Sequence, residues 1–559
     1  MATQTLQPDI TRQASAYAGA LPVSGQIKNN LRSLARSKLL WGLLLLAAAL
    51  GYGYAMAVPA VDMDDLAIAT YQQGGEFLRQ GRITVWLLQA LTGVMTYQRF
   101  WPELFFAASL LLAGMVLAAV LYAAARRQPG VPGAFLLAAG LLLWPYHGEI
   151  LMYSNQCGVG LGYLLCALAL ALALPHLLNG WHTGWRSACG AAVCLCFALG
   201  LYESFAPVWL TLVFAALLLD AGAAEPHSRK AAGICGSVLR GIWPLAAALV
   251  LRKALAAVLC AANGVSGQDG TASKTIFWFR RASLKDAVVI PVREWLTNYV
   301  ARAFGVPALA LLALACWAVV LWCALHRRGN GQALFAAGLV VSQFSLGLLQ
   351  GTGAQMARTV QCFAVFVPFA LWLWLAPELD GHPEKKWKTA VCAALAVVFL
   401  AVEWTSLTGT IQYNRDRWQY EEQLLEKTAA QLDELDPTGT LPVAFVGEAE
   451  LPEELQQRLV IPQTNPAYKA AYLIYAVLGG PLGDLERYEN PQTLVINWAQ
   501  DAFGGKQQML LLMQQAGRPC TLAEPDQQDE ANVLAAAGEA PAGVSQQDGY
   551  LLVNFTGWN

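Results

Sequence analysis

The sequence predicts a polytopic α-helical membrane protein with about eleven transmembrane helices and a small C-terminal α/β domain. Three observations predict this fold class. The 559-residue chain is 56% hydrophobic and only 13% charged, whereas a soluble domain has about 25% charged residues. Apolar runs long enough to span a bilayer recur from residue 39 to residue 408 and then stop. Beyond residue 410 the chain holds 8 Lys and Arg but 21 Asp and Glu, so a basic membrane part precedes an acidic tail.

The charge and the cysteine and histidine patterns argue against two classes of function. A net charge of -2 does not support nucleic-acid binding. The 12 Cys form no CxxC pair, and most lie inside apolar runs, where they act as small buried hydrophobic residues. The 6 His show no metal-ligand spacing, so zinc chemistry is not expected.

The predicted membrane part, 39–408, follows a polar N-terminal segment, 1–38. Its first apolar run ends at Ala55-Met56-Ala57, which is similar to a signal-peptide cleavage site. The run is longer than the core of a signal peptide and lies far from the start, which favours a retained span. The predicted spans are 39–57, 101–124, 131–146, 157–175, 187–203, 205–220, 236–260, 303–325, 332–350, 359–376 and 388–408.

The basic connecting segments predict the orientation of these spans. Arg126-Arg127, Arg229-Lys230 and Lys385-Lys386 fall on the same side as the basic N-terminal segment, and Lys and Arg accumulate on cytoplasmic loops. The N-terminus is therefore predicted to be cytoplasmic. The opposite, outer face then holds the segments 58–100, 147–156, 202–203, 263–300 and 351–358 and the tail, 409–559. Two half-inserted helices also fit the close pair of spans around "LGLYESFAPVW".

Two of the outer loops are long and suited to the membrane surface. Residues 65–96 carry apolar residues at helical spacing among polar ones, which predicts one or two helices in the interface. Residues 263–300 combine aromatic residues with cations, among them Lys274 and Arg280, which can hold an anionic lipid headgroup.

The acidic tail is predicted to form the small α/β domain outside the membrane. It begins with an amphipathic helical pattern, "NRDRWQYEEQLLEKTAAQLDEL". Short strand-like runs follow at 443–447, 493–497 and 550–555, separated by Pro, Gly and acidic turns. The tail offers no phosphate-binding glycine loop and no nucleophile elbow.

The acidic stretch "VDMDD" after the first span is the main candidate for chemistry. Asp62, Asp64 and Asp65 also fit a hydrated loop without a task, which is the ordinary role of acids at a span end. A carboxylate at the membrane boundary can instead act as general base for an acceptor hydroxyl. Arg79 and Arg82 follow in the same loop, and guanidinium groups bind phosphate well. These are the groups needed to move a sugar from a lipid-phosphate carrier.

Further polar residues come to the predicted outer face from distant spans. Each also has a structural interpretation: Glu203 can cap a helix, Arg358 can extend its head into water, and Arg252 with Lys253 can simply end the seventh span at the interface. The candidate residues for substrate or phosphate binding are therefore Asp62, Arg79, Arg82, Glu149, Tyr202, Glu203, Lys274, Arg280 and Arg358.

The order of these features resembles the GtrII-type glucosyltransferases, membrane enzymes of the broader GT-C class. The resemblance rests on "DMDD" followed by "GEFLRQGR", on "LGLYESF" at a span boundary, and on "AFVGEAE" and "GYLLVNFTG" near the end. Two departures concern the site: the first Arg after the acids comes only at position 79, and Glu203 stands where the family tends to have Gln.

The resemblance implies transfer of a hexose, glucose by the family name, from a polyprenyl-phosphate carrier to a cell-surface glycan outside a bacterial inner membrane. It implies inversion at the anomeric carbon, with Asp64 or Asp65 as base and with Arg79, Arg82 or Arg358 stabilising the phosphate. It implies no metal and no cofactor, because the lipid-linked sugar is a co-substrate. It leaves the oligomeric state open.

Two other classes of function also occur among polytopic membrane proteins and are alternatives to a transferase. A transporter or flippase of lipid-linked sugars should show internal repeats and charges at mid-span, and neither is evident. A non-enzymatic membrane sensor or assembly protein would explain the acidic tail but would leave the outer carboxylates and arginines without a task.

Overall fold

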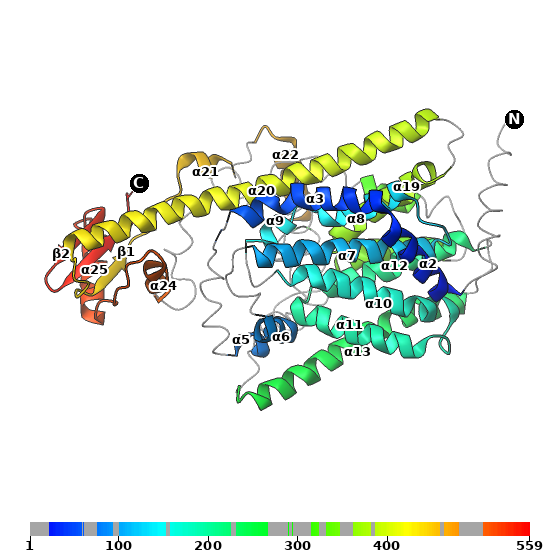
Figure 1. Cartoon of the computed structure of the whole chain (residues 1–559), viewed down its shortest axis with the longest axis horizontal. Coiled ribbons are helices and arrows are strands. Elements are labelled where there is room, and N and C mark those ends of the chain that lie inside the picture. The colour runs from blue at the N-terminus through cyan, green and yellow to red at the C-terminus, as the bar shows by residue number, and fades with distance from the viewer. Residues whose placement is uncertain are drawn as a thin grey trace.

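The computed structural model describes residues 22–58, 60, 75–92, 100–152, 157–224, 231–265, 289, 293, 315–322, 331–346, 361–381, 386–458, 463–479 and 507–558. Helices dominate this part of the chain, and they form a bundle from which one long helix extends toward a small sheet (Figure 1). We refer to the end of the bundle nearest to this sheet as the sheet end.

Six of the described helices are long and apolar enough to cross a membrane, as expected for a multi-pass membrane protein. Four shorter apolar helices fall within or near other predicted spans, and the predicted span 303–325 lies mostly outside the described residues. The number eleven therefore stays a prediction. The six long helices are α3 (Lys38–Ala57), α7 (Trp101–Ala124), α10 (Val159–Asn179), α12 (Phe205–Ala223), α13 (Ala231–Ala262) and α20 (Lys386–Leu435), and the shorter ones are α8 (Val131–Leu142), α11 (Trp185–Leu201), α17 (Gln332–Ser342) and α19 (Phe363–Leu379).

Short or amphipathic helices complete the bundle. Helix α2 (Val23–Arg36) packs on α7, where Asn30 Nδ2 donates to the carbonyl oxygen of Ala119 at 3.1 Å. Helices α5 (Glu76–Arg79) and α6 (Ile83–Thr92) occupy the loop for which one or two helices are predicted. Helix α9 (His147–Ile150) follows α8 at the sheet end.

Helix α20 runs without interruption for 50 residues, from the bundle into the tail. The sequence predicts a span ending at residue 408 and a separate tail helix from residue 414, so the predicted domain boundary falls inside α20. No Pro interrupts this stretch, and a single Gly inside a helix costs only about 1 kcal/mol. The buried side chains of Leu407 and Ile411 pack into the bundle core, while those of Leu424, Leu425 and Leu432 pack against the sheet.

The sheet of the tail has three strands in the order β1-β3-β2. Strands β1 (Val443–Val446) and β3 (Tyr550–Asn554) pair in parallel with Val443 opposite Leu551, and β2 (Gly543–Gln547) pairs antiparallel with β3. Both strands β1 and β3 occupy predicted runs, whereas β2 was not predicted and the run 493–497 lies outside the described residues.

Both faces of the sheet are covered by helices. Phe445 and Val553 face the end of α20 and α24 (Gln507–Gln515), while Ala444 and Leu552 face α25 (Pro525–Ala536). The alternation along β1 and β3 is the period of two that a strand imposes on its side chains. Two further helices, α21 (Glu453–Gln457) and α22 (Pro466–Leu478), lie between β1 and α24 in the chain.

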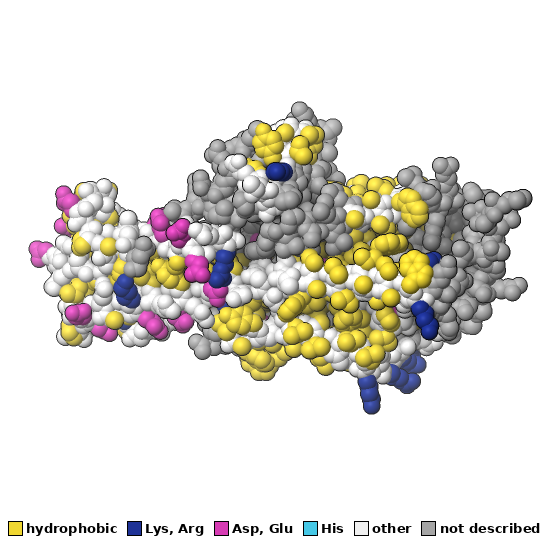
Figure 2. Space-filling view, turned by 90° about the horizontal axis from the view of Figure 1, so that it is seen from above, with side chains coloured by type: hydrophobic (Ala, Val, Ile, Leu, Met, Phe, Trp, Pro, Cys, Tyr) yellow, Lys and Arg dark blue, Asp and Glu magenta, His cyan; other side chains and the backbone are white. Residues whose placement is uncertain are grey.

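The turn between α20 and β1 is organised by Asp436. Its carboxylate accepts from the Thr438 hydroxyl and from the backbone amides of Thr438 and Leu441. These hydrogen bonds, that of the Thr438 hydroxyl above all, stabilise the charged form and lower the pKa of Asp436 to about 2. Figure 2 shows acidic side chains over the tail and apolar side chains over the bundle, in accord with the charge division of the sequence.

Candidate functional site

The structure describes five of the eleven site residues that the sequence predicts. They are Arg79, Arg82, Glu149, Tyr202 and Glu203. The other six, Asp62, Asp64, Asp65, Lys274, Arg280 and Arg358, lie outside the described residues, so their roles stay predictions.

The helix pair α5–α6 is shaped by two glycines in the left-handed region. Gly75 precedes α5 with φ 68°, and Gly81 forms the turn to α6 with φ 73°. A Cβ atom at residue 75 would lie 2.5 Å from Cγ2 of Val265, just after α13, and one at residue 81 would lie 2.9 Å from Nη2 of Arg252. Both positions therefore need glycine for backbone conformation and for close approach. Phe77, on α5, is buried.

Arg252, on α13, fixes this turn to a second turn at the sheet end of the bundle. Its Nε donates to the carbonyl oxygen of Gly81 at 3.0 Å, and its Nη2 lies 2.7 Å from Oε1 of Glu203. Glu203 stands in the turn between α11 and α12, so one guanidinium joins three segments that are distant in sequence. The side chain of Arg252 is 12% exposed and that of Glu203 is 49% exposed, which places the ion pair at the surface of the bundle.

Arg82 lies beside this ion pair, over the ring of Tyr202. Its Cζ is 5.1 Å from the ring centroid, which is the geometry of a cation–π contact. The Thr84 hydroxyl donates to the carbonyl oxygen of Phe197 at 2.7 Å and so holds the start of α6 against α11. Figure 1 shows α5 and α6 beside α11 and α13 at the sheet end.

The structure thus brings together Arg82, Tyr202 and Glu203, three of the predicted residues, and adds Arg252. We call these four side chains the Arg82 cluster. The interpretation that Arg252 lies where a span reaches the interface stays a prediction, and the helix itself continues to Ala262, ten residues further. The "RK" pair inside an apolar run was the available signal, because buried or half-buried charge in a span needs a partner.

The remaining two predicted residues differ in their surroundings. Arg79 lies 3.2 Å from Glu76 within α5, so part of its charge is already balanced. Glu149 is half-buried in α9, and α9 packs on α20, where Asn414 Nδ2 donates to the carbonyl oxygen of Gly148 at 3.4 Å.

A second ionic contact joins the two helix ends that flank residues 58–100, and the sequence analysis missed it. Nη2 of Arg415, on α20, lies 3.0 Å from Oε1 of Glu103 in the first turn of α7. The same nitrogen donates at 3.1 Å to the carbonyl oxygen of Ala55, in the last turn of α3. The side chains of Arg415 and Glu103 are 2% and 13% exposed. The periodic signal was present, because Arg415 continues the buried stripe of Leu407 and Ile411 at i+4 spacing.

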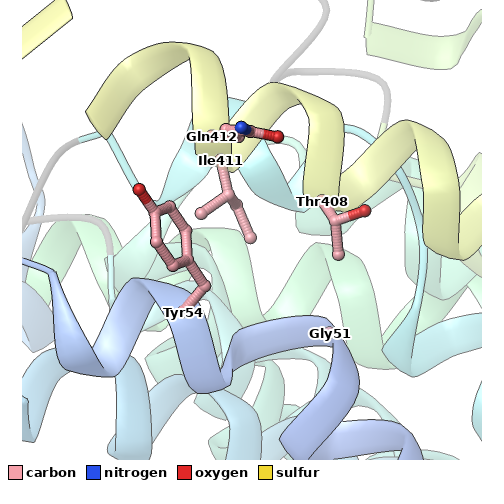
Figure 3. Close-up of a pocket in the computed structure, with 5 residues that line it drawn as sticks. All are labelled: Gly51, Tyr54, Thr408, Ile411 and Gln412. Atoms are coloured by element: carbon pink, nitrogen blue, oxygen red, sulfur yellow. The ribbon is translucent and has the colours of Figure 1, made fainter. Parts of the chain in front are cut away.

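A groove lies next to this contact, between α3 and α20 (Figure 3). Its volume is about 300 Å³, and Gly51, Tyr54, Thr408, Ile411 and Gln412 line it. This volume is at the lower end of the range of ligand pockets, about 300–1,000 Å³. The phenol of Tyr54 rises from α3 toward α20 on one side of Ile411, and Thr408 lies on the other. The groove opens to the surroundings of the bundle, since Tyr54 is 42% exposed.

In the part of the chain that the structure describes, no group of three His, Cys, Asp or Glu side chains is placed to hold a metal ion. The absence of a metal stays a prediction, because Asp62, Asp64 and Asp65 are not among the described residues.

The comparison with protein families identifies the chain. The family model described as "Glucosyl transferase GtrII" matches residues 53–371, more than half of the 559 residues. The match begins in the last turns of α3 and includes the acidic stretch, the Arg82 cluster and most of α19. The searches of curated proteins and of solved structures gave no match. The match to the family model confirms the resemblance seen in the sequence, and the chain belongs to the GtrII glucosyl transferase family.

Proposed function

We propose that this protein transfers a hexose, glucose by its family, from a polyprenyl-phosphate carrier to a glycan at the outer face of a bacterial inner membrane. The observation that carries the proposal is the Arg82 cluster, which gathers two guanidinium groups at the sheet end of a membrane-spanning bundle. A phosphate carried on a lipid reaches the membrane boundary at this depth, and guanidinium groups are suited to bind it. Family membership favours transfer over transport.

The distribution of charge supports the proposed orientation. Basic residues accompany helix ends far from the sheet, such as Arg36 at the end of α2 and Lys386 at the start of α20 (Figure 1). Because Lys and Arg accumulate on the cytoplasmic side, the sheet end faces outward. The N-terminus is then cytoplasmic, and the tail lies outside the membrane.

The proposed reaction is a displacement at the anomeric carbon. The acceptor hydroxyl oxygen forms the new bond to that carbon, the bond from carbon to the phosphate oxygen breaks, and the configuration inverts. Asp64 or Asp65 takes the hydroxyl proton, and the carrier leaves as polyprenyl phosphate. Charge grows on the phosphate as the bond breaks, so cations held in place near it lower the barrier.

The contacts divide the candidate residues between binding and support. Arg82 is the proposed phosphate-binding residue of the loop, since its described contact is the uncharged ring of Tyr202, whereas Arg79 is paired with Glu76. Glu203 holds Arg252, which makes it a supporting residue in this proposal. Arg358 stays a second proposed phosphate ligand, Lys274 and Arg280 proposed headgroup ligands, and Glu149 a proposed substrate contact.

The test uses the full-length protein in lipid nanodiscs with polyprenyl phosphate carrying radiolabelled glucose, and a glycan extract of the cell envelope as acceptor. We expect label to move into the glycan and unglycosylated polyprenyl phosphate to accumulate in equal amount. Empty nanodiscs and a nucleotide-activated glucose donor are the controls. Movement of intact labelled carrier across a sealed vesicle, without any label in glycan, would contradict the proposal and favour transport.

One prediction concerns the support of the proposed phosphate ligand. Arg252→Met removes the guanidinium that donates to the carbonyl oxygen of Gly81 and pairs with the carboxylate of Glu203. The α5–α6 turn should therefore open more often. We expect amide hydrogen exchange of residues 79–84 to become about ten- to a hundredfold faster, since a hydrogen bond to a charged group contributes roughly 1.5–3 kcal/mol. Lys253→Met is the matched control, because Lys253 is the exposed neighbour. Equal exchange in both variants would mean that packing alone holds the turn.

A further inference from the structure

We propose that helix α22, in the tail, lies in the headgroup region at the outer face of the membrane, with one apolar face in lipid. The observations concern which residues of α22 are exposed, where the helix lies along the bundle, and what holds its other face. The proposal does not depend on the transfer reaction.

The exposed face of α22 is apolar. Tyr472, Leu473 and Val477 are 46%, 63% and 79% exposed, and Ala476 is exposed beside them. Together with Lys469, these positions have the spacing i, i+3, i+4, i+7 and i+8, which forms one stripe along a helix. In a soluble protein such a stripe faces the core. Here it faces away from the protein, so water is an unfavourable surrounding for it.

The opposite face of α22 is held by the protein. Tyr468 and Tyr475 are buried, at 9% and 3% exposure. Arg293, which precedes α17 in the chain, lies with its Cζ 5.1 Å from the ring centroid of Tyr475. Its Nη1 donates to the carbonyl oxygen of Gly479, just after the helix, at 3.2 Å. The exposed stripe is therefore not the face by which α22 attaches to the rest of the chain.

The position of α22 identifies lipid as what covers the stripe. Figure 1 shows α22 at the same position along the long axis of the molecule as α9, where the spanning helices end. Figure 2 shows apolar side chains on the part that stands out from the bundle at this level. Tyr and Lys next to aliphatic side chains are typical of a helix whose apolar face enters the lipid headgroup region by about 5–10 Å. A second copy is a poor fit, because one 13-residue helix offers far less than the roughly 800 Å² per partner of a stable interface.

The test is photolabelling of the full-length protein in nanodiscs that contain a phosphatidylcholine with a diazirine in its acyl chain. We expect label on the peptide that contains Tyr472, Leu473 and Val477, as on the lipid-exposed Val397 and Val398 of α20. The matched control is α25, where Val533 is also strongly exposed, at 67%. In the described part of the chain, helix α25 packs on the sheet of the tail and not on the bundle. Its peptide should carry about tenfold less label, in line with the loss of apolar contact with lipid.

A double variant separates contact with lipid from general proximity. Leu473→Gln with Val477→Gln should reduce label on the α22 peptide about tenfold and leave label on α20 unchanged, since polar side chains leave the acyl region. If the α22 peptide of the parent carries no more label than the α25 peptide while α20 is labelled, the proposal is wrong. Cross-linking of α22 to a second copy, without lipid label, would also overturn it.

Discussion

Arg415→Met is expected to destabilise the protein by roughly 3–5 kcal/mol, the typical loss when one partner of a buried ion pair is removed. Glu103 would remain at 13% exposure without the cation that lies 3.0 Å from it, and the carbonyl oxygen of Ala55 would lose its donor. The measurement is the free energy of unfolding of the full-length protein in mixed micelles, from titration with a denaturing detergent.

Two further variants make this expectation specific. Arg458→Met removes the ion pair with Asp416, the neighbour of Arg415, but that pair is 42% and 24% exposed and should contribute less than about 1 kcal/mol. Arg415→Met combined with Glu103→Gln removes both charges of this pair, and should recover most of the stability. If Arg415→Met and Arg458→Met lower the free energy of unfolding by the same amount, the buried contact between α3, α7 and α20 does not stabilise the protein more than an exposed ion pair does.

Asp64→Asn or Asp65→Asn should lower kcat by about 10²–10⁴-fold, the typical contribution of a positioned general base. Asparagine keeps the size and polarity of aspartate but cannot accept the hydroxyl proton. KM for the donor should change little, because the proposed base acts on the acceptor. The measurement is the release of polyprenyl phosphate in nanodiscs at saturating donor.

Asp529→Asn, at an exposed position of α25 in the tail, is the control for the loss of one negative charge, and its kcat should stay within a few-fold of the parent. Detergent unfolding should show equal stability for all three variants. If both Asp64→Asn and Asp65→Asn turn over as fast as the parent, neither carboxylate is the base. The transfer reaction itself would still stand, because donor consumption by the parent tests it separately.

The sequence predicted the elements whose signal is local. Long apolar runs gave α3, α7 and α10, because length and hydropathy alone define a span. Strands β1 and β3 followed from short runs of apolar residues between turn residues. Strand β2, "GVSQQ", has a polar edge composition and forms through its pairing with β3, which no local pattern indicates.

The parts that the sequence did not predict depend on contacts between distant residues. Arg415 and Glu103 are 312 positions apart, and spacing within one segment cannot pair them. Arg252 joins residues 171 and 49 positions away, so only the folded bundle shows that it supports the turn beside Arg82. The continuity of α20 is a similar case: its apolar and amphipathic halves look like two elements, and packing at both ends makes them one.

Because α20 is one continuous helix, its length fixes the distance between the bundle and the sheet. Its 27 residues after position 408 extend for about 40 Å at 1.5 Å per residue. Helical geometry also fixes direction, since each added residue turns the sheet by about 100° about the axis. An insertion of seven residues would keep the facing of the sheet nearly unchanged and raise it by about 10 Å. The length of this helix thus sets both the distance of the sheet from the bundle and the direction in which the sheet faces.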